Sequence, residues 1–403
     1  MELLIQCKLH EREMPNVTSN SIWYQIAHYH PSPFVLWVAI VQCGLVLTTI
    51  VGNLLVCIVI SLDKNLQSVT NYMLMSLALA DLAVAIFVMP PGIIVFYLDG
   101  KWVFGKRLCA VWCLLDVLMC TSSIMHLTSI SIDRYLAIAK PLSTKVSKTR
   151  CKVFTKICAV WIISITISCP VLFLGLKYPY KVLPTAHVCL LNDRNFKIYG
   201  SIAAFFIPLS VMITTYTLNI KILSKKAKLC RSYGRQAQGG ASTKLLPLPN
   251  SSFNSYSYQP TCLKSANEKR QQMKITNEQK AAKLLGVVFG VFVVCWFPFF
   301  AFNFLNAICS SCTDAVPDYV ANTFLWAGYV SSTINPMVYI VFNKRFRRAY
   351  YKVLFCRYCS KSYIEMERMK AINHSITCVS FKKTSSQSLS PNLSQRTVAC
   401  LNS

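Results

Sequence analysis

The chain has 403 residues, of which 54% are hydrophobic and only 14% are charged. This balance is too apolar and too poor in charge for an ordinary soluble domain of that length. The formal net charge is +27, with 42 Lys and Arg against 15 Asp and Glu. Because the basic residues flank apolar segments, they favour anionic lipid and a cytoplasmic protein as partners, and they argue against a nucleic acid.

The apolar residues gather into seven runs of roughly 20 residues or more, long enough to cross a hydrocarbon core of about 30 Å. The runs are continuously apolar rather than alternating, which predicts helices and excludes barrel strands. We therefore expect an all-α membrane protein in which residues 34–342 form a seven-transmembrane helix bundle. The predicted spans are Phe34–Ile60, Asn71–Tyr97, Arg107–Ala139, Lys152–Leu176, Phe196–Ser224, Thr276–Ala307 and Asp318–Phe342.

The distribution of Lys and Arg predicts the orientation of the bundle. Basic loops stay on the cytoplasmic side, and most of the 42 Lys and Arg fall there if the N-terminus lies outside. We therefore expect a multi-pass plasma-membrane protein with residues 1–33 extracellular and the C-terminus cytoplasmic. Asn16 begins an Asn-Val-Thr triplet on the outer side and is an expected glycosylation site.

The third inner loop, about residues 225–275, contains a polar stretch rich in Ser, Asn, Gln and Gly. We expect this stretch, Arg231 to Ala266, to be disordered.

After the last span, residues 343–355 are basic and aromatic, which predicts a short amphipathic eighth helix on the inner leaflet. A cytoplasmic tail is expected over residues 356–403. Two of its cysteines are candidate palmitoylation sites, Cys356 and Cys359.

Four of the 19 cysteines lie in predicted outer loops or at the outer end of a span, where the compartment is oxidising. We expect Cys109, at the start of the third span, to pair with Cys189 in the second outer loop. We expect Cys309 to pair with Cys312 in the third outer loop. The spacing of the last two could suggest zinc or redox chemistry, but no second such pair and no nearby histidine pair completes a four-ligand site.

Three acidic residues, Asp81, Asp116 and Asp133, lie inside predicted spans beyond the first turn, where a charge is costly and therefore suggests a function. Asp116 follows Cys109 by seven residues, which places it about 10 Å further along the helix. This is the depth of a cleft open to the outside. A carboxylate at this depth would pair with a cationic ligand. Three further candidate contacts lie within about one helical turn of it, Val117, Cys120 and Thr121.

The sixth span presents an aromatic face that supports the same site. Trp296, Phe299, Phe300 and Asn303 recur at the spacing of one helical face. The rings could stack on a ligand ring and Asn303 could form a hydrogen bond at the rim, while the carboxylate holds an ammonium. Core packing is the alternative for such a stripe, but the nearby carboxylate favours a site for an aromatic amine.

Asp133, Arg134 and Tyr135 lie about 25 Å beyond Asp116 along the third span, at its cytoplasmic end. Arg134 could also pair with Glu278, near the inner end of the sixth span. Such an ion pair would join two helices and break when they separate to admit a partner. A plain pair of charges at a helix end is the alternative.

Asp81 lies in mid-membrane, and Ser123 and Asn335 lie at comparable depths in their own spans. These residues could hold a sodium ion, the hypothesis we favour, or form a polar packing network. Kinks whose geometry can change between states are expected at three prolines, Pro208, Pro298 and Pro336.

Several motifs, in the right order and in the right spans, resemble those of rhodopsin-like G-protein-coupled receptors. They are Asn53, Leu77-Ala78-Leu79-Ala80-Asp81, Asp133-Arg134-Tyr135, Trp161, Cys295-Trp296-Phe297-Pro298 and Asn335-Pro336-Met337-Val338-Tyr339. Each motif alone is weakly specific, whereas the set is specific. The resemblance covers roughly Val35 to Cys359, apart from the third inner loop.

Within this class, Asp116 together with Phe299, Phe300 and Tyr329 resembles the aminergic receptors. Further segments are similar to serotonin type 2 receptors, namely Leu115-Asp116-Val117-Leu118, Ser123-Ile124-Met125-His126-Leu127, Asn277-Glu278-Gln279-Lys280-Ala281, Phe297-Pro298-Phe299-Phe300 and the set Gly200, Ser201 and Ala204. The one hydroxyl of that set suits the single ring hydroxyl of serotonin better than a catechol. Cys120 stands where vertebrate members carry serine, which puts the transfer of drug selectivity in doubt and leads us to expect an invertebrate member.

The resemblance places two more residues in the ligand pocket, Leu191 and Tyr329. It assigns the movement during activation to a further set, Trp296, Ile124, Pro208, Phe292, Tyr216, Pro336 and Tyr339. It also implies coupling to q-class G proteins, and thus phospholipase C and calcium release, with arrestin and receptor kinases as further partners.

Other functions agree less well with the sequence. A receptor for octopamine, tyramine or dopamine is the nearest alternative, and additional serines in the fifth span would have favoured it. An opsin needs a lysine for retinal in the seventh span, and the sequence has none between Asn322 and Asn335. A transporter or channel predicts paired repeats, broken half-helices or rings of charge, and an enzyme predicts a metal cluster or an activated nucleophile. The sequence shows none of these patterns.

Overall fold

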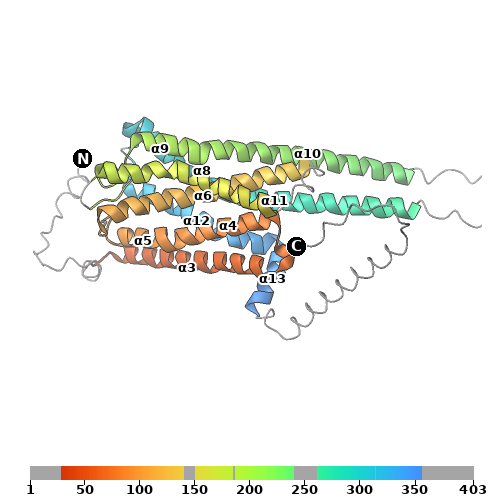
Figure 1. The fold of residues 1–403 in the computed structure, drawn as a ribbon, viewed down its shortest axis with the longest axis horizontal. Coiled ribbons are helices and arrows are strands. Elements are labelled where there is room, and N and C mark those ends of the chain that lie inside the picture. The colour runs from red at the N-terminus through yellow and green to blue at the C-terminus, as the bar shows by residue number, and fades with distance from the viewer. Residues whose placement is uncertain (1–28, 140–149, 185–186, 240–260, 314, 356–403) are drawn as a thin grey trace, which may run out of the picture. The chain divides into compact units, whose positions relative to one another are not determined.

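The computed structural model describes residues 29–139, 150–184, 187–239, 261–313 and 315–355 (Figure 1). The secondary structure of these residues is helical, and no strand of a sheet occurs among them. The chain divides into two units, Met1–Asn343 and Lys344–Ser403. The first unit contains all seven predicted spans.

Each predicted span lies within one helical segment, which confirms the predicted fold class. The segments are α3 (Pro33–Leu62), α4 (Val69–Ala83) continued by η2 (Val84–Val88) and α5 (Met89–Tyr97), α6 (Gly105–Ala139), α8 (Arg150–Lys177), α9 (Arg194–Gly200) continued by η4 (Ser201–Phe206) and α10 (Ile207–Gly239), α11 (Thr261–Ile308) and α12 (Asp318–Phe342). Short 3-10 turns lie between them, η1 (Lys64–Leu66), η3 (Pro179–Lys181) and η5 (Ser310–Cys312).

Six of the segments are long and apolar enough to cross a membrane. The seventh, α12, has 25 residues but is more polar. Four polar side chains of its second half are buried in the bundle, Ser331, Ser332, Thr333 and Asn335. By contrast, large apolar side chains such as Trp37, Phe154 and Val294 are exposed, as expected of a surface that meets lipid.

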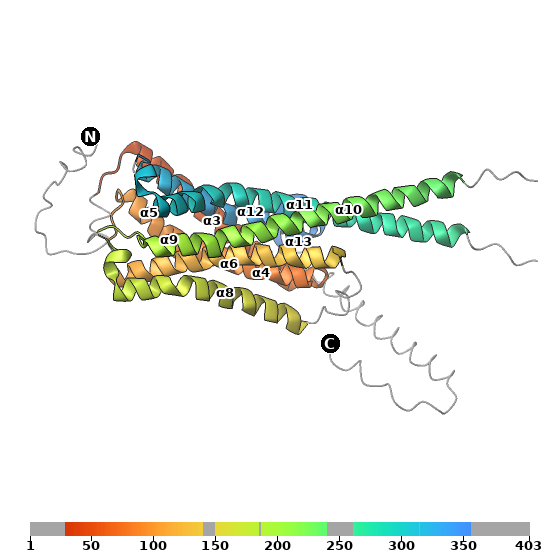
Figure 2. The same cartoon turned by 90° about the horizontal axis from the view of Figure 1, so that it is seen from above.

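α6 lies at the centre of the first unit. It packs against α4, α8, α10 and α11, and Figure 2 shows it between α10 and α8. α3 packs against α4 and α12, while α12 also packs against α11. Asp116 and Asp133 lie on α6, and Asp81 lies on α4, which packs against it.

Side-chain caps determine where three of the helices begin. Ser32 caps α3, Ser68 caps α4 and Asp193 caps α9. In each case the side-chain oxygen accepts a hydrogen bond from the backbone N–H three residues later, a donor that the helix itself leaves unpaired.

Two spans contain a π turn next to a proline. η4 directly precedes the turn of α10 that holds Pro208, and η2 directly precedes the turn of α5 that holds Pro90 and Pro91. Proline lacks a backbone N–H and its ring clashes with the carbonyl four residues earlier, so the helix widens to accommodate it. The other two prolines predicted to interrupt spans, Pro298 and Pro336, lie inside α11 and α12.

The helices that border the third inner loop are longer than predicted. α10 continues to Gly239 and α11 begins at Thr261, so parts of the stretch predicted to be disordered are helical. Lys, Ala, Arg and Gln are frequent there and have good helix propensity, which allows each helix to continue past the apolar segment. Figures 1 and 2 show both helices extending beyond their neighbours. Residues 240–260 lie outside the described part of the chain.

The described part of the second unit is α13 (Lys344–Leu354), the short eighth helix that the sequence predicts. It combines basic and aromatic side chains, Lys344, Arg345, Arg347, Arg348, Lys352, Phe346, Tyr350 and Tyr351. Cys356 and Cys359 lie outside the described residues, as does Asn16 in the first unit. Palmitoylation and glycosylation therefore stay predictions.

The close approach of α8 to α6 generates a stability prediction. A Cβ added to Gly175 would lie 2.5 Å from the Cβ of Ala110, whereas one added to Gly44 in α3 would meet nothing within 4 Å. We expect Gly175→Ala to reduce the stability of the detergent-solubilised protein by about 1–3 kcal/mol, because overpacking forces helices apart. Thermal unfolding checks this, with Gly44→Ala as the matched control. Equal melting temperatures for the two variants would contradict the close packing.

Candidate functional site

Asp116 of α6 is held by hydrogen bonds from two helices. Its Oδ1 atom accepts one from the hydroxyl of Tyr329 in α12 at 2.9 Å, and a longer one from the Sγ atom of Cys120 at 3.5 Å. Both donors are buried. An ionised carboxylate can accept at about four positions, so these two contacts leave capacity for a cationic ligand.

Trp296 lies at the centre of an aromatic cluster beside this carboxylate. Its ring centroid is 5.9 Å from that of Phe299, 5.7 Å from that of Phe300 and 6.5 Å from that of Tyr329. Its Nε1 atom donates a hydrogen bond to Ser331 Oγ at 2.9 Å, which orients the indole. Tyr329 thus connects the predicted anchor, Asp116, to the predicted aromatic face.

The π turn η4 brings the predicted residues of the fifth span against this cluster. Ser201 and Ala204 lie in η4 and are buried. In the same turn, Phe205 stacks on Phe300 with centroids 4.6 Å apart and planes at 7°. Phe205 also lies 6.3 Å from Phe292, which is itself 6.5 Å from Trp296. The predicted relay from Trp296 to Phe292 is therefore a contact between neighbouring rings.

A disulfide joins the start of α6 to the loop before α9. Cys109 and Cys189 are bonded, and Cys309 is bonded to Cys312 in the other predicted pair. Leu191, two residues after Cys189, packs with Val117 against the apolar cluster around this disulfide. Leu191 and Val117, the residue that follows Asp116, therefore border the same apolar cluster, and the pocket-lining role of Leu191 stays a prediction.

The same loop is held by an ion pair. Lys181 Nζ lies 2.6 Å from Asp193 Oδ2, and the other carboxylate oxygen of Asp193 caps α9. The hydrogen bond to Asp193 raises the pKa of Lys181 above its ordinary value. Burial opposes ionisation of Asp193, but hydrogen bonds from Lys181 and from the Phe196 backbone hold its pKa below the ordinary value. Both groups are therefore charged at neutral pH.

Two residues predicted to contact the ligand, Asn303 and Thr121, do not face the rim of a pocket. Asn303 donates its side-chain N–H to the carbonyl of Phe299 in its own helix at 2.9 Å. Thr121 is only 2% exposed.

Three residues next to Trp296 or Phe300 were not predicted, namely Phe205, Ser331 and Gly328. A Cβ on Gly328 would lie 2.7 Å from Trp296 Cζ3, and nothing in the spacing of the sequence indicates this contact.

Asp81 forms a second buried polar cluster. Ser123 Oγ donates to its Oδ1 at 3.1 Å, and Asn335 Nδ2 donates to its Oδ2 at 2.9 Å, so the predicted trio is in contact. Asp81 is 0% exposed. Carboxylate, hydroxyl and amide oxygens are the ligands that a small hard cation prefers. The residue types of this cluster therefore fit a sodium ion.

Two contacts hold the charged end of α6 against its neighbours. Asp133 forms an ion pair with Lys156 of α8, and Lys226 of α10 donates to the carbonyl of Ile138 at 2.7 Å. The side chain of Glu278 lies outside the described part, so its pairing with Arg134 stays a prediction. The other residues of the predicted activation set lie on α6 (Tyr135, Ile124), α10 (Pro208, Tyr216), α11 (Phe292) and α12 (Pro336, Tyr339).

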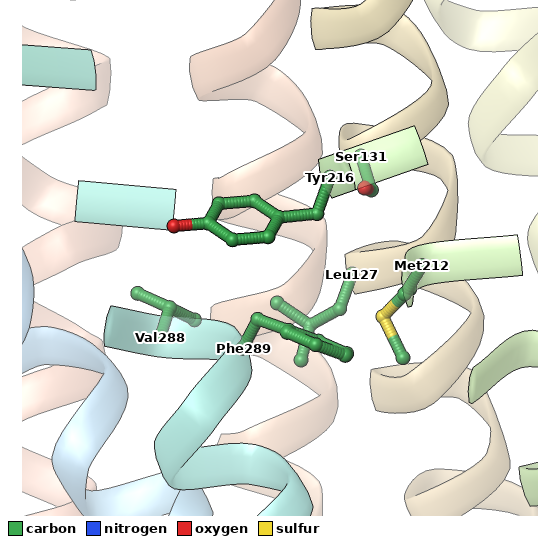
Figure 3. A pocket seen from close by; sticks show the side chains of 6 residues that line it. All are labelled: Leu127, Ser131, Met212, Tyr216, Val288 and Phe289. Carbon is green, nitrogen blue, oxygen red and sulfur yellow. The ribbon is translucent and has the colours of Figure 1, made fainter. Parts of the chain in front are cut away.

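A cavity lies between α6, α10 and α11, separate from the cluster around Asp116. Figure 3 shows its lining residues, Leu127, Ser131, Met212, Tyr216, Val288 and Phe289. Only Tyr216 among them belongs to a residue set predicted from the sequence. The cavity is therefore a feature of helix packing near the activation residues and is no part of the predicted amine site.

The chain matches the sequence profile of the 7 transmembrane receptor (rhodopsin family) over residues 52–339. The chain belongs to the rhodopsin family of seven-transmembrane receptors. Members of this family are receptors rather than enzymes, which confirms that the chain is no enzyme. Together with the membrane-spanning helices, the family makes it a multi-pass protein of the plasma membrane.

This rhodopsin-family receptor is similar to 5-hydroxytryptamine receptor 2C of three mammals. It is 40% identical over 333 residues to the protein of Homo sapiens and to that of Pan troglodytes, and 40% identical over 342 residues to that of Canis lupus familiaris. Each match covers 80% of this chain and 73% of the relative. The predicted resemblance to serotonin type 2 receptors is confirmed, whereas the invertebrate origin stays a prediction.

Replacing a cysteine of the Cys109–Cys189 disulfide tests whether this bond fixes the loop before α9 in this rhodopsin-family receptor. Cys113 provides a matched control, because its free thiol lies only 3.8 Å from Cys189 Sγ. We expect Cys189→Ser to cost about 2–5 kcal/mol and to reduce surface expression, whereas Cys113→Ser leaves both nearly unchanged. Peptide mapping without reduction checks the pairing. A Cys113–Cys189 linkage in the unsubstituted chain would contradict it.

Proposed function

We propose that the chain is a serotonin receptor of the cell surface that binds the protonated amine through Asp116 and activates q-class G proteins. Stimulation of phospholipase C and calcium release follow. The observation that carries the proposal is the contact of Asp116 with Tyr329 beside Trp296. It places one half-buried acid next to an aromatic cluster, which is the chemistry that an aromatic ammonium ligand requires.

The anchor role of Asp116 follows from the cost of burying charge. A carboxylate in an apolar bundle is stabilised when a cation shares its site, and the resulting hydrogen bond is stronger than one between neutral groups. Tyr329 donates to the carboxylate and so orients it. The ligand ring would then contact the ring faces of Trp296, Phe299 and Phe300.

Serotonin is favoured over other amines by the fifth span and by the relatives. Ser201 supplies one buried hydroxyl in η4, and Ala204 supplies none. The relatives, 40% identical, are named 5-hydroxytryptamine receptors. A single hydroxyl donor or acceptor would pair with the ring hydroxyl of serotonin. Octopamine, tyramine and dopamine are the alternative ligands.

The proposed orientation places the end with the Cys109–Cys189 disulfide outside the cell. Disulfides form in oxidising compartments, and basic loops remain in the cytoplasm. The paired charges of Asp133 and Lys156 and the long ends of α10 and α11 would then face the G protein, with arrestin and receptor kinases as later partners.

Signalling would follow from a shift between two conformations. The amine would bind more tightly to a state with an open cytoplasmic face, and a bound G protein would raise amine affinity by the same factor. Asp81, Ser123 and Asn335 would hold an allosteric sodium ion. Sodium there would favour one of the two states, because separation of α4, α6 and α12 would disperse its ligands.

The first test compares the chain with its Asp116→Asn variant by calcium release in cells given serotonin, dopamine, octopamine, tyramine or histamine. We expect a response selective for serotonin. We expect the variant to lose about 30-fold or more in potency, since removing one partner of a desolvated charge pair costs roughly 2–5 kcal/mol.

Asp99→Asn is the matched control for the loss of one acidic residue. Asp99 is exposed and has a φ of 55°, a conformation that Asn also adopts readily. Its variant should respond like the unsubstituted chain. A stronger response to another amine would exclude serotonin as the preferred ligand, and undiminished potency of Asp116→Asn would exclude the anchor.

A second test separates the ring hydroxyl from the amine. We expect Ser201→Ala to lower serotonin potency about 3- to 10-fold, the effect of a neutral hydrogen bond of about 0.5–1.5 kcal/mol. Tryptamine lacks the ring hydroxyl, so its potency should not change. Equal losses for both ligands would show that Ser201 does not recognise the hydroxyl.

A further inference from the structure

We propose that Gly286 of α11 is a positioning residue. Because glycine has no side chain, the hydroxyl end of Tyr216 from α10 fits against the α11 backbone there. We call this contact the seat, and it holds α10 and α11 in a closed arrangement. The inference rests on the proposed function insofar as it concerns signalling. The seat itself is a matter of helix packing, and it can be tested without any ligand.

The hydroxyl of Tyr216 occupies the place of a side chain at position 286. A Cβ added to Gly286 would lie 2.2 Å from Tyr216 Oη, 2.7 Å from Cζ and 2.9 Å from Cε2. Real carbon atoms do not approach so closely, so the ring has to move if residue 286 gains a side chain. The obstacle is the whole phenol end of a ring attached to another helix.

The ring crosses from α10 to α11 next to the cavity described above. Figure 3 shows the hydroxyl end of Tyr216 at the α11 backbone and the ring above Val288 and Phe289. The centroids of Tyr216 and Phe289 are 6.3 Å apart, with planes inclined at 36°.

Gly290, one turn further along α11, distinguishes the seat from a general effect of glycine in this helix. A Cβ at Gly290 would meet nothing within 4 Å. Both glycines lower the intrinsic stability of the helix, so alanine at either position gains the same helix propensity. Only alanine at 286 has to displace Tyr216.

The seat exists only while the backbone of α11 at residue 286 lies against α10. Separation of the two helices would release Tyr216, and conversely displacement of Tyr216 weakens the closed arrangement. Gly286 therefore sets the balance between closed and open states. A side chain at position 286 therefore favours the open state, and because the agonist binds that state more tightly, it raises agonist affinity.

The experiment compares Gly286→Ala with Gly290→Ala in the full-length receptor. Hydrogen exchange of the ligand-free protein should rise around residue 286 in the first variant and not in the second. Serotonin affinity, measured in membranes with excess guanine nucleotide to remove G-protein coupling, should rise about tenfold in Gly286→Ala alone, equivalent to about 1.4 kcal/mol.

The Tyr216→Ala background shows whether the effect passes through the ring. There, Gly286→Ala should alter neither exchange nor affinity, whatever Tyr216→Ala does by itself. If Gly286→Ala alone fails to fold, the double variant should reach the surface, because the clash is gone. Equal behaviour of the two glycine variants, or an effect that persists without Tyr216, would overturn the proposal.

Failure of the proposed function has a different signature. An unsubstituted chain that does not bind serotonin would contradict the assigned ligand, while the exchange comparison of the two glycine variants would still decide on the seat. Unchanged exchange in Gly286→Ala would overturn the seat even if serotonin proves to be the ligand.

Discussion

A polar side chain buried in a membrane-spanning helix cannot reach water, so its hydrogen-bond partner comes either from the backbone of its own helix or from another helix. α6 carries the largest share of such groups. Asp116 is bound by Tyr329 of α12, and Ser123 binds Asp81 of α4, which is also bound by Asn335 of α12. These contacts determine the rotation of α6 relative to α4 and α12, and hence which residues surround the amine site.

A buried histidine extends the same constraint to α8. Nδ1 of His126 lies 2.7 Å from the carbonyl of Ser122, which can only accept, so this nitrogen carries the proton. Nε2 then accepts from Ser76 Oγ at 2.8 Å, and Ser76 accepts from Trp161 Nε1 at 3.1 Å. The neutral ring thereby satisfies groups on α4, α6 and α8, next to the Asp81 cluster.

α11 connects the candidate amine site with the proposed seat. Trp296 and Phe300 lie beside the anchor, and Gly286 lies about three turns earlier in the same helix. Because a helix moves largely as a rigid body, a shift of its aromatic end is transmitted to the end that packs on Tyr216. The packing around Phe205, Phe292 and Phe300 is where such a shift would begin.

The sequence by itself determined the seven spans, the depth of Asp116 and the aromatic face of the sixth span, because hydropathy and helical spacing are local properties. Partners across helices were harder to predict. Asp133 pairs with Lys156, and Gly286 accommodates Tyr216. Only the tertiary structure decided these contacts, because they depend on the rotation and separation of helices that are far apart in the chain.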